Sequence, residues 1–413
     1  MTTRSAGETS LPPTAGCVVI GGGVIGVSCA FRLAEAGAVT TGASPRAGGS
    51  ATRNPRKNAG VLLLERAELG GGSTAKAAGG IRSSFTSPVN VELGLRGLAA
   101  YRAFSRDFGT EIDFRRDGYL YLVTDPADVP AFERCAELQR EHGVRSHLLD
   151  PGEAKKVLPL VETDGVVAAL WSPDDAKATP DAVVQGYARA ARAHGATLRT
   201  GVEVIGIERD GDALTGVVTT AGFVRTGAVV CAAGAWSGRI GELAGLDLPV
   251  RPFRRQVVFT GPVPGLPESV PLTIEMPSAF YFHREGPGLA MSFSEDDGVP
   301  GFDTRYEPGE WLPRLAELAG RRIPAVLDAG VRTAWAGLYE MTPDRNQIIG
   351  ESVLLSRFFY ATGFSGHGFQ MGPATGELIR DLYLRRRPAV DIAELDVRRF
   401  EAVDTAPAEH NIV

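Results

Sequence analysis

Residues 17–26 of this chain read CVVIGGGVIG. The apolar, partly β-branched run 17–20 predicts a buried strand, and the glycines that follow have the G-x-G-x-x-G spacing. Residues 27–37 then carry apolar side chains at helical intervals and end at Gly37, a typical helix stop. A strand, a glycine turn and a helix in this order predict a dinucleotide site, because the turn lets the backbone approach a pyrophosphate and the helix N-terminus donates N–H groups. The predicted cofactor contacts in this stretch are Gly21, Gly23, Val24, Ile25 and Gly26.

The acidic partner of such a turn usually follows the glycines by about 20 residues, at the end of the second strand. Here the second strand is predicted at 61–64 and is followed by Glu65. The delay indicates an insertion loop at 38–60, which is basic and contains no acidic residue. This loop is either tolerated loop growth or a basic arm for a partner. We expect Glu65 to accept a hydrogen bond from a ribose 2′-OH, with Arg66 beside it.

A second glycine-rich loop occupies residues 363–372, after an apolar strand at 357–362 and before a helix predicted at 373–384. The N-terminus of that helix can stabilise negative charge. A reduced flavin carries such charge on its ring, whereas a nicotinamide needs no second loop. The pair of loops therefore favours FAD over NAD. The predicted contacts in the second loop are Gly363, Gly366, His367, Gly368, Phe369 and Gln370.

Composition limits the remaining possibilities. A chain of 413 residues is too long for one hydrophobic core, so we expect two domains. The net charge of −6 indicates no nucleic-acid-binding face. The four cysteines are scattered, which predicts no metal site and no disulfide framework and fits a cytoplasmic location. No apolar run is long enough to predict a membrane span, and residues 1–15 are predicted to be a flexible tail.

At this point the chain resembles the FAD-dependent amine and amino-acid oxidoreductases of the D-amino acid oxidase, glycine oxidase and sarcosine oxidase family. The sarcosine and dimethylglycine dehydrogenase branch is the most similar. The resemblance rests on segments that run in family order, namely 18–26, Glu65 with 72–74 and 79–82, 232–237, and 335–350 with 363–368.

The resemblance implies an α/β (α+β) fold with a Rossmann-like FAD-binding domain and a discontinuous substrate domain built on an antiparallel sheet. The FAD-binding domain is expected at 16–100, 165–248 and 336–395, and the substrate-binding domain at 101–164 and 249–335. The implied reaction is oxidation of an amine C–N bond by hydride transfer to flavin N5, giving an imine that hydrolyses. Electrons then pass to molecular oxygen or to an acceptor protein. The sequence makes no prediction of the oligomeric state.

Two departures from the family predict that FAD is bound non-covalently. Monomeric sarcosine oxidases attach the flavin through a cysteine in the segment that matches 337–339, and no cysteine stands there in this chain. Dimethylglycine dehydrogenases use a histidine in the segment that matches 72–76, where this chain has Lys76. The further cofactor contacts predicted from the matching segments are Gly72, Ser73, Thr74, Gly79, Gly80, Ile81, Val204, Ala233, Gly234, Trp236 and Gly337.

The candidates for substrate binding and catalysis come from several segments. Arg82 aligns with an active-site arginine of sarcosine oxidases, and Arg332 is a candidate anchor for a substrate carboxylate. Tyr281 and His283 alternate on one predicted strand, so they are expected to share a face. The remaining candidates are Tyr339, His367 and Gln370.

Two other functions remain open from the sequence. The chain could oxidise the C–O bond of a 2-hydroxy acid, since such dehydrogenases share the fold. It could also be a non-catalytic assembly protein that retains FAD, for which the basic insertion is the support. Bleaching of the flavin by amines would distinguish oxidation of an amine C–N bond from both alternatives.

Overall fold

The computed structural model describes residues 10–37, 60–294 and 298–401. The predicted insertion loop therefore lies outside the described residues, apart from Gly60. The predicted N-terminal tail is also only partly described. Its last residues are attached to the fold, because Ala15 N donates to Arg225 O (2.9 Å) and Arg225 N donates to Pro13 O (3.0 Å). The tail is therefore anchored before residue 16.

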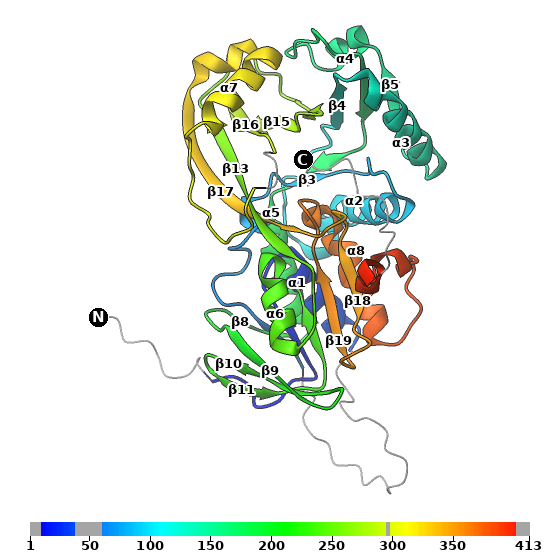
Figure 1. The fold of residues 1–413 in the computed structure, drawn as a ribbon, viewed down its shortest axis with the longest axis vertical. Helices are drawn as coiled ribbons and strands as arrows, with labels where there is room; N and C mark the ends of the chain where they lie inside the picture. The colour runs from blue at the N-terminus through cyan, green and yellow to red at the C-terminus, as the bar shows by residue number, and fades with distance from the viewer. Residues whose placement is uncertain (1–9, 38–59, 295–297, 402–413) are drawn as a thin grey trace, which may run out of the picture.

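A six-stranded sheet forms the lower half of the molecule (Figure 1). Its strands are parallel except for the antiparallel edge strand β18. The order across the sheet is β18 (Ile348–Glu351), β19 (Phe358–Thr362), β12 (Val229–Cys231), β1 (Cys17–Ile20), β2 (Val61–Leu64) and β8 (Thr197–Arg199). Both β1 and β2 are buried along their whole length, as expected of parallel strands covered on both faces.

Helices cover one face of this sheet, and a small sheet with one helix covers the other. The helices on the first face are α1 (Val24–Glu35), α2 (Pro88–Phe108), α5 (Pro180–Ala193) and α8 (Gly368–Tyr383). The second face packs against α6 (Ser237–Ala244) and the antiparallel meander β9 (Val204–Asp210), β10 (Ala213–Thr219) and β11 (Gly222–Arg225). The sequence runs 202–207, 214–219 and 223–226 predict such a meander.

An eight-stranded, mainly antiparallel sheet forms the upper half (Figure 1). Its order is β17 (Val331–Met341), β13 (Arg251–Thr260), β16 (Gly288–Ser292), β15 (Phe280–Glu285), β14 (Leu272–Met276), β4 (Tyr119–Val123), β6 (Ala168–Ser172) and β5 (His147–Leu149). The helices of this half are α3 (Val129–Glu141), α4 (Pro151–Val157) and α7 (Trp311–Arg322). The α/β (α+β) class with a Rossmann-like sheet and a second antiparallel sheet is confirmed.

Short elements complete the fold. The strands β3 (Gly80–Ile81) and β7 (Ala176–Lys177) pair with each other. The single-turn and 3₁₀ helices are η1 (Thr74–Lys76), η2 (Pro126–Asp128), η3 (Gly234–Trp236), η4 (Pro324–Ala329), η5 (Ala393–Leu395) and η6 (Val397–Glu401).

Two local predictions differ from the structure. The alternation in residues 113–124 predicts strands on both sides of a turn at Gly118, but only β4 forms, and it is buried throughout. Before Gly118 the chain makes one isolated bridge, from Arg115 to Lys177. The strand β6 lies in the segment 165–248 assigned to the FAD-binding domain, yet it pairs with β4 and β5 of the second sheet because its backbone hydrogen bonds run to those strands. The other domain boundaries remain a prediction.

The last helix begins earlier than predicted. We expected it to start at Pro373, but α8 begins at Gly368 and contains Pro373 in its interior. Proline has no N–H, so the carbonyl four residues earlier, that of Phe369, has no helical donor. The Tyr101 hydroxyl of α2 donates to Phe369 O (2.6 Å) and replaces the missing bond. A contact from a distant helix thus allows the proline to lie inside α8.

Candidate active site

One cavity of about 800 Å³ extends from the glycine turn of β1 to the strands of the upper sheet. The structure brings most of the predicted site residues together around it. The predicted residues that line it are Gly21, Gly23, Val24, Ile25, Glu65, Arg66, Gly72, Ser73, Thr74, Gly79, Gly80, Arg82, Val204, Ala233, Gly234, Trp236, Tyr281, Gly337, Tyr339, Gly366, His367, Gly368, Phe369 and Gln370. Those outside its lining are Gly26, Ile81, Gly363, His283 and Arg332.

The glycine turn after β1 is as tight as its sequence predicts. Gly21 has φ +112°, and a Cβ at this position would lie 2.2 Å from Ala232 O. A Cβ on Gly26 would lie 1.9 Å from Gly21 O, so Gly26 closes the turn from behind instead of lining the cavity. The first turn of α1 has no acidic residue, its N-cap Gly23 has no side chain, and Val24 N donates to Thr74 Oγ1 (3.2 Å). Its N-terminal N–H groups and positive potential therefore face the cavity and suit an anion.

Glu65 lies where the second-strand carboxylate of a dinucleotide site is expected. Its Oε2 accepts from Gly22 N (2.7 Å) and its Oε1 accepts from Ala67 N (2.8 Å). These bonds fix the carboxylate at the cavity wall, and each oxygen keeps a lone pair for a ribose hydroxyl. Arg66 lies over the Trp236 ring, 3.8 Å from its centroid, so its cation–π contact holds it at the rim.

The second glycine loop reaches the cavity from the opposite end of the chain. His367 precedes α8, whose first turn has neither a side-chain cap nor an acidic residue. Gly366 has φ +97°, and a Cβ there would lie 2.4 Å from the Tyr339 ring. Only glycine therefore lets the loop pack on β17. The N-termini of two helices, α1 and α8, thus open on one cavity. This arrangement fits the two regions of negative charge in a reduced flavin dinucleotide.

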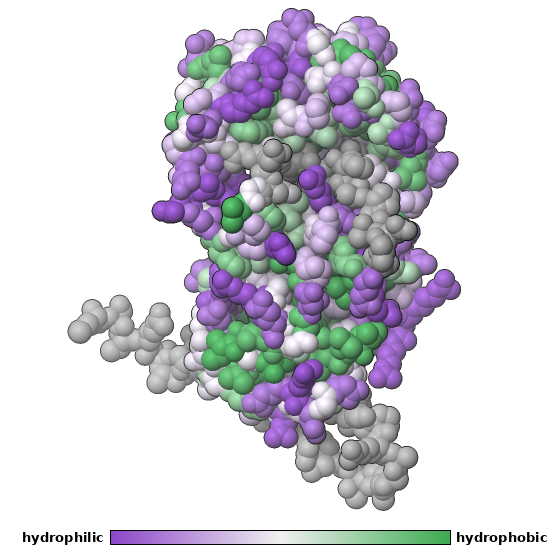
Figure 2. All heavy atoms as spheres, viewed as in Figure 1, coloured by the Kyte–Doolittle hydropathy of each residue, from purple (hydrophilic) through white to green (hydrophobic). Residues whose placement is uncertain are grey.

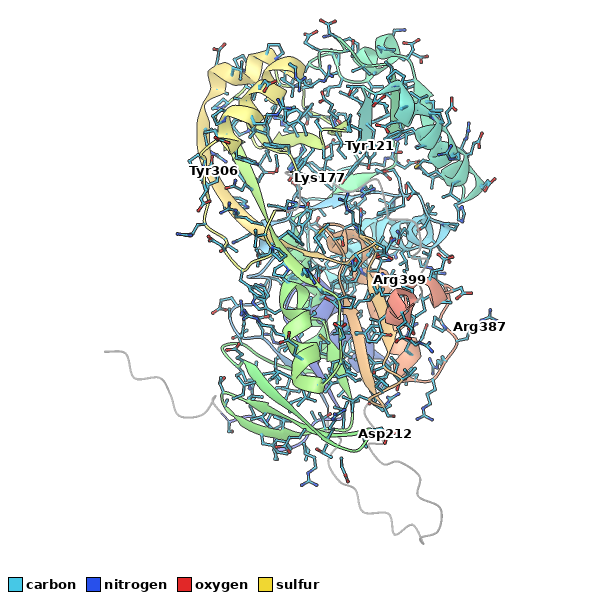
Figure 3. All side chains as sticks on the ribbon, in the orientation of Figure 1. Tyr121, Lys177, Asp212, Tyr306, Arg387 and Arg399 are labelled. Atoms are coloured by element: carbon cyan, nitrogen blue, oxygen red, sulfur yellow. The ribbon has the colours of Figure 1, made fainter. Side chains whose placement is uncertain are left out.

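Outside the glycine loops the lining is a mixture of cations, phenols and amides from both sheets. Arg82 is buried; its N donates to Gln370 Oε1 (2.7 Å), its Nη1 donates to Ser84 O (2.7 Å), and its guanidinium lies 4.2 Å from the Phe85 centroid. Figure 3 shows this region, where Tyr121 and Lys177 lie at the junction of the two halves.

Burial shifts the ionisation of several groups near the cavity. It raises the pKa of Tyr281 and Tyr339, so both phenols stay protonated. Burial also raises the pKa of Glu340 to about 7, although Thr362 Oγ1 donates to its Oε2 (2.8 Å). Burial and the charge of Arg82 lower the pKa of His367 well below its usual range. The site therefore disfavours charge on its own phenols and imidazole.

Two candidates for the substrate region lie elsewhere. His283 is buried beyond the cavity lining, and its Nδ1 contacts Arg284 O (3.0 Å). Burial and the nearby Lys177 lower its pKa to about 4. Arg332 is exposed at the start of β17, which reaches the cavity only from Gly337 onward. Strand alternation predicts the face of a residue, but it does not predict where along the strand a cavity lies.

Several lining residues are not among the predicted site residues. Arg255 of β13 pairs with Gly337 of β17 and lies over the Tyr339 ring, 5.2 Å from its centroid. Its neighbour Arg254 makes a rim ion pair with Glu307 (2.9 Å). The available signal was the alternation of these two arginines on a strand, which turns one of them inward. The other missed residues include Tyr119, Gln256, Ser292 and Glu340.

Two apolar side chains stand at the surface of the cavity. Ile205 of β9 and Leu243 of α6 line it and are substantially exposed. Figure 2 shows apolar residues gathered as a band across the lower half, where Figure 1 shows these elements. Within residues 10–37, 60–294 and 298–401, no helix has the length and apolar character needed to cross a membrane. In the same residues no group of three or more His, Cys, Asp or Glu side chains is arranged to hold a metal ion.

A Rossmann-like sheet whose cavity is approached by two helix N-termini and roofed by an antiparallel sheet defines a flavin-dependent oxidoreductase. The chain belongs to the FAD dependent oxidoreductase family, which it matches over residues 17–382. The resemblance stated from the sequence is thereby confirmed, and FAD is the cofactor of this family.

Named relatives agree with this assignment. The 4-methylaminobutanoate oxidase (formaldehyde-forming) of Paenarthrobacter nicotinovorans is 28% identical over 94% of this chain and 46% of its own length. Human mitochondrial sarcosine dehydrogenase is 27% identical over 94% of this chain and 42% of its own length. The chain thus spans less than half of these relatives. Among solved structures, L-proline dehydrogenase from P. horikoshii has a TM-score of 0.86 and 32% identity, with 96% of this chain and 100% of that chain covered. Glycine oxidase from Geobacillus kaustophilus has a TM-score of 0.79 and 25% identity, with 94% and 99% covered.

Proposed function

We propose that this chain oxidises the C–N bond of an amine or amino acid with FAD as its cofactor. The observation that carries the proposal is one cavity that joins two helix N-termini to the buried guanidinium of Arg82. The names of the relatives support an amine or amino-acid substrate.

The residues present fit FAD. The turn at Gly21 leaves no room for a side chain, and the N–H groups of α1 suit a pyrophosphate. Glu65 suits a ribose hydroxyl, and the N-terminus of α8 suits the negative charge of a reduced ring. When bound, FAD supplies a two-electron acceptor for the C–H next to the substrate nitrogen.

We propose that the cofactor is held without a covalent bond. The position that carries a cysteine in covalent relatives lies in the segment 337–339, where this chain has Gly337, Leu338 and Tyr339. Lys76 stands where a histidine would be needed, and its Nζ donates to Ala336 O (2.6 Å).

The substrate carboxylate is assigned to Arg82, with Arg255, which lies over the Tyr339 ring, as a second guanidinium. A guanidinium offers a donor fork that matches a carboxylate. The neutral phenols of Tyr281 and Tyr339 favour a substrate amine without its extra proton, because a desolvated site disfavours an unpaired ammonium. The neutral amine keeps the lone pair that drives oxidation at the adjacent carbon.

Three finer assignments are proposals as well. The FAD-binding domain is proposed at 16–100, 165–248 and 336–395 without β6, and the substrate domain at 101–164 and 249–335 together with β6. Electrons are proposed to pass to molecular oxygen or to an acceptor protein. A cytoplasmic location rests on cysteine usage, since Cys17, Cys29, Cys135 and Cys231 are all unpaired.

The test is anaerobic titration of the purified flavoprotein with primary, secondary and N-methyl amino acids. We expect at least one amine to bleach the flavin band, and readmitted oxygen then separates an oxidase from a dehydrogenase by the rate of reoxidation. Bleaching by 2-hydroxy acids alone would replace the proposal with C–O oxidation. A flavin that no substrate reduces, with a co-purifying protein, would support the assembly role.

A further inference from the structure

A line of carboxamide side chains runs to His367 from the loop that precedes β18. Asn346 Nδ2 donates to Asp344 O (3.3 Å), and Asn90 Nδ2 of α2 donates to Asn346 Oδ1 (2.8 Å). Gln347 Nε2 then donates to Asn90 Oδ1 (2.8 Å), and Gln347 Oε1 contacts His367 Nε2 (2.9 Å). Each amide in the line is placed by the one before it.

The first group in this line fixes the direction of all the others. The backbone carbonyl of Asp344 can only accept, so Asn346 must turn its NH₂ group toward it and its oxygen toward Asn90. The same reasoning passes from Asn90 to Gln347, whose oxygen must face the imidazole. That oxygen needs a donor, and the donor is His367 Nε2–H. The neutral ring then carries its lone pair on Nδ1.

The start of the line is itself anchored. Arg399 of η6 forms a buried ion pair with Asp344 (Nε to Oδ2, 2.7 Å) and donates to Asn346 O (2.9 Å). Figure 3 shows Arg399 beside β18 and α8. Thr342 Oγ1 also donates to Asn346 O (2.7 Å). This loop is therefore a fixed support for the amide line.

The other end of the line is His367, in the wall of the cavity. His367 is 4% exposed and lines the cavity, and its Nδ1 has no hydrogen-bond partner among the described residues. Burial and the Arg82 charge keep the ring neutral. A buried acceptor of this kind is costly unless a ligand supplies its donor.

We propose that Gln347, oriented by Asn90, is a positioning residue that locks His367 in the Nε2–H tautomer, so that Nδ1 accepts a hydrogen bond from the N–H group of the substrate amine. The identity of the donor rests on the proposed function, whereas the tautomer follows from the amide line alone.

The surroundings explain why the donor is a substrate that also carries a carboxylate. Phe85 packs against both groups: the Arg82 guanidinium lies 4.2 Å from its centroid, and the His367 ring lies 5.5 Å from it, edge to face. The anion-binding group and the N–H acceptor therefore lie around one aromatic ring, within reach of one small amino acid. Holding the N–H at Nδ1 leaves the nitrogen lone pair free for the reaction.

The experiment is ¹⁵N NMR of the FAD-loaded protein labelled at its six histidines, with a His367→Asn variant to assign the His367 signals. We expect a neutral Nε2–H imidazole in the wild type. In Gln347→Leu a second tautomer appears, while Gln347→Glu, which retains an acceptor oxygen, keeps the first. A wild-type ring with Nδ1–H, an imidazolium, or an unchanged tautomer in Gln347→Leu overturns the positioning role. The wild-type spectrum decides the tautomer even if Gln347→Leu fails to fold.

The donor is tested on protein whose flavin has been reduced chemically, so that no turnover occurs. L-proline, or another secondary amine that reduces the flavin if proline does not, is compared with its oxygen analogue, which for proline is tetrahydrofuran-2-carboxylate. We expect the amine to shift the Nδ1 resonance and the analogue to leave it in place. If FAD alone shifts the Nδ1 resonance and the amine causes no further shift, the substrate amine is not the hydrogen-bond donor to His367.

Kinetics give a second measure. In Gln347→Leu we expect the KM for the amine to rise about tenfold with a smaller change in kcat, as for the loss of one hydrogen bond, and Gln347→Glu to retain the wild-type KM. An unchanged KM in Gln347→Leu would contradict the hydrogen bond. If no amine reduces the flavin, the proposed function fails, while the tautomer measurement, which needs no substrate, still decides the role of Gln347.

Discussion

Two adjacent carboxylates, Asp174 and Asp175, should have opposite effects on the pH dependence of stability. Asp175 is fully buried, and its Oδ1 accepts from Ser83 N (2.9 Å) and Ser83 Oγ (2.8 Å). Its Oδ2 is buried without a hydrogen-bond partner in the described part of the chain. Burial raises the pKa of Asp175 from 3.8 to about 7. The folded protein therefore binds this proton more tightly than the unfolded chain does.

The sign follows from proton linkage. Between the unfolded pKa of 3.8 and the folded pKa of about 7, the unfolded chain has released the proton and the folded protein has kept it. The free energy of unfolding therefore falls as the pH rises through this window. A shift of about 3 units corresponds to about 4 kcal/mol, which is lost fully above pH 7. Asp175→Asn should remove this dependence. At about 1.4 kcal/mol per pH unit, the stability difference between variant and wild type should therefore change by about 3 kcal/mol in favour of the variant between pH 5 and pH 8.

Asp174 supplies the matched control. Arg145 holds it through a rim ion pair (2.5 Å) and lowers the pKa of Asp174, first through that hydrogen bond. Its contribution is present above pH 3.8 and is lost only below that value, so Asp174→Asn should differ from the wild type by a constant, small amount between about pH 5 and pH 8.

The assay is urea unfolding of the wild type and both variants at several pH values in that range, followed by circular dichroism. Asparagine also introduces a buried N–H group, whose cost is independent of pH and shifts the whole curve without changing its slope. Parallel pH profiles for the wild type and Asp175→Asn would refute the reasoning. If the pH dependence of stability disappeared in Asp174→Asn instead, the titrating residue would be Asp174 and not Asp175.

Further changes test the rest of the site. A Cβ on Gly97 of α2 would lie 1.9 Å from Gln370 O, so Gly97→Ala should destabilise the protein by roughly 1–3 kcal/mol and weaken FAD retention. Gly227 lies in open space, so Gly227→Ala should have neither effect. Thermal melts and flavin-release assays measure the two effects. Arg255→Met should raise the KM of a carboxylate-bearing amine about tenfold or more, and Arg332→Met should leave it unchanged; equal effects would remove Arg255 from the site. Acid precipitation should release all the flavin into the supernatant, and flavin that stays with the pellet would contradict non-covalent binding.

The cofactor end of the site was predictable because its chemistry is local in the chain. The turn at Gly21 needs a strand before it and a helix after it, and both are visible in neighbouring residues. Glu65 was found despite the insertion because the apolar run before it ends at the same edge of the sheet as β1. At the glycine turns the neighbouring backbone lies so close that a side chain would collide with it. Glycine is therefore required there, and its clustering is visible in the sequence.

The substrate end was less predictable because it depends on pairing between distant strands. Arg255 lies at the cavity because β13 pairs with β17 in one particular register, which a single sequence does not reveal. Arg332 lies on the same strand β17 and was a reasonable carboxylate anchor, yet it is exposed several residues before the strand reaches the cavity. His283 shares its strand with Tyr281 but lies beyond the lining.

Helix α2 shows how residues outside the predicted site determine its geometry. Tyr101 donates to Phe369 O and completes the first turns of α8 around Pro373. Gly97 lets the two helices approach at Gln370, and Asn90 orients the amide that faces His367. These residues follow one side of α2 over several turns, so one rigid helix sets the position and the hydrogen-bond direction of the α8 N-terminus. The glycine loop that indicated a flavin therefore depends on α2, a helix that contains no cofactor motif. Substitutions on this side of α2 should alter flavin binding and amine binding together.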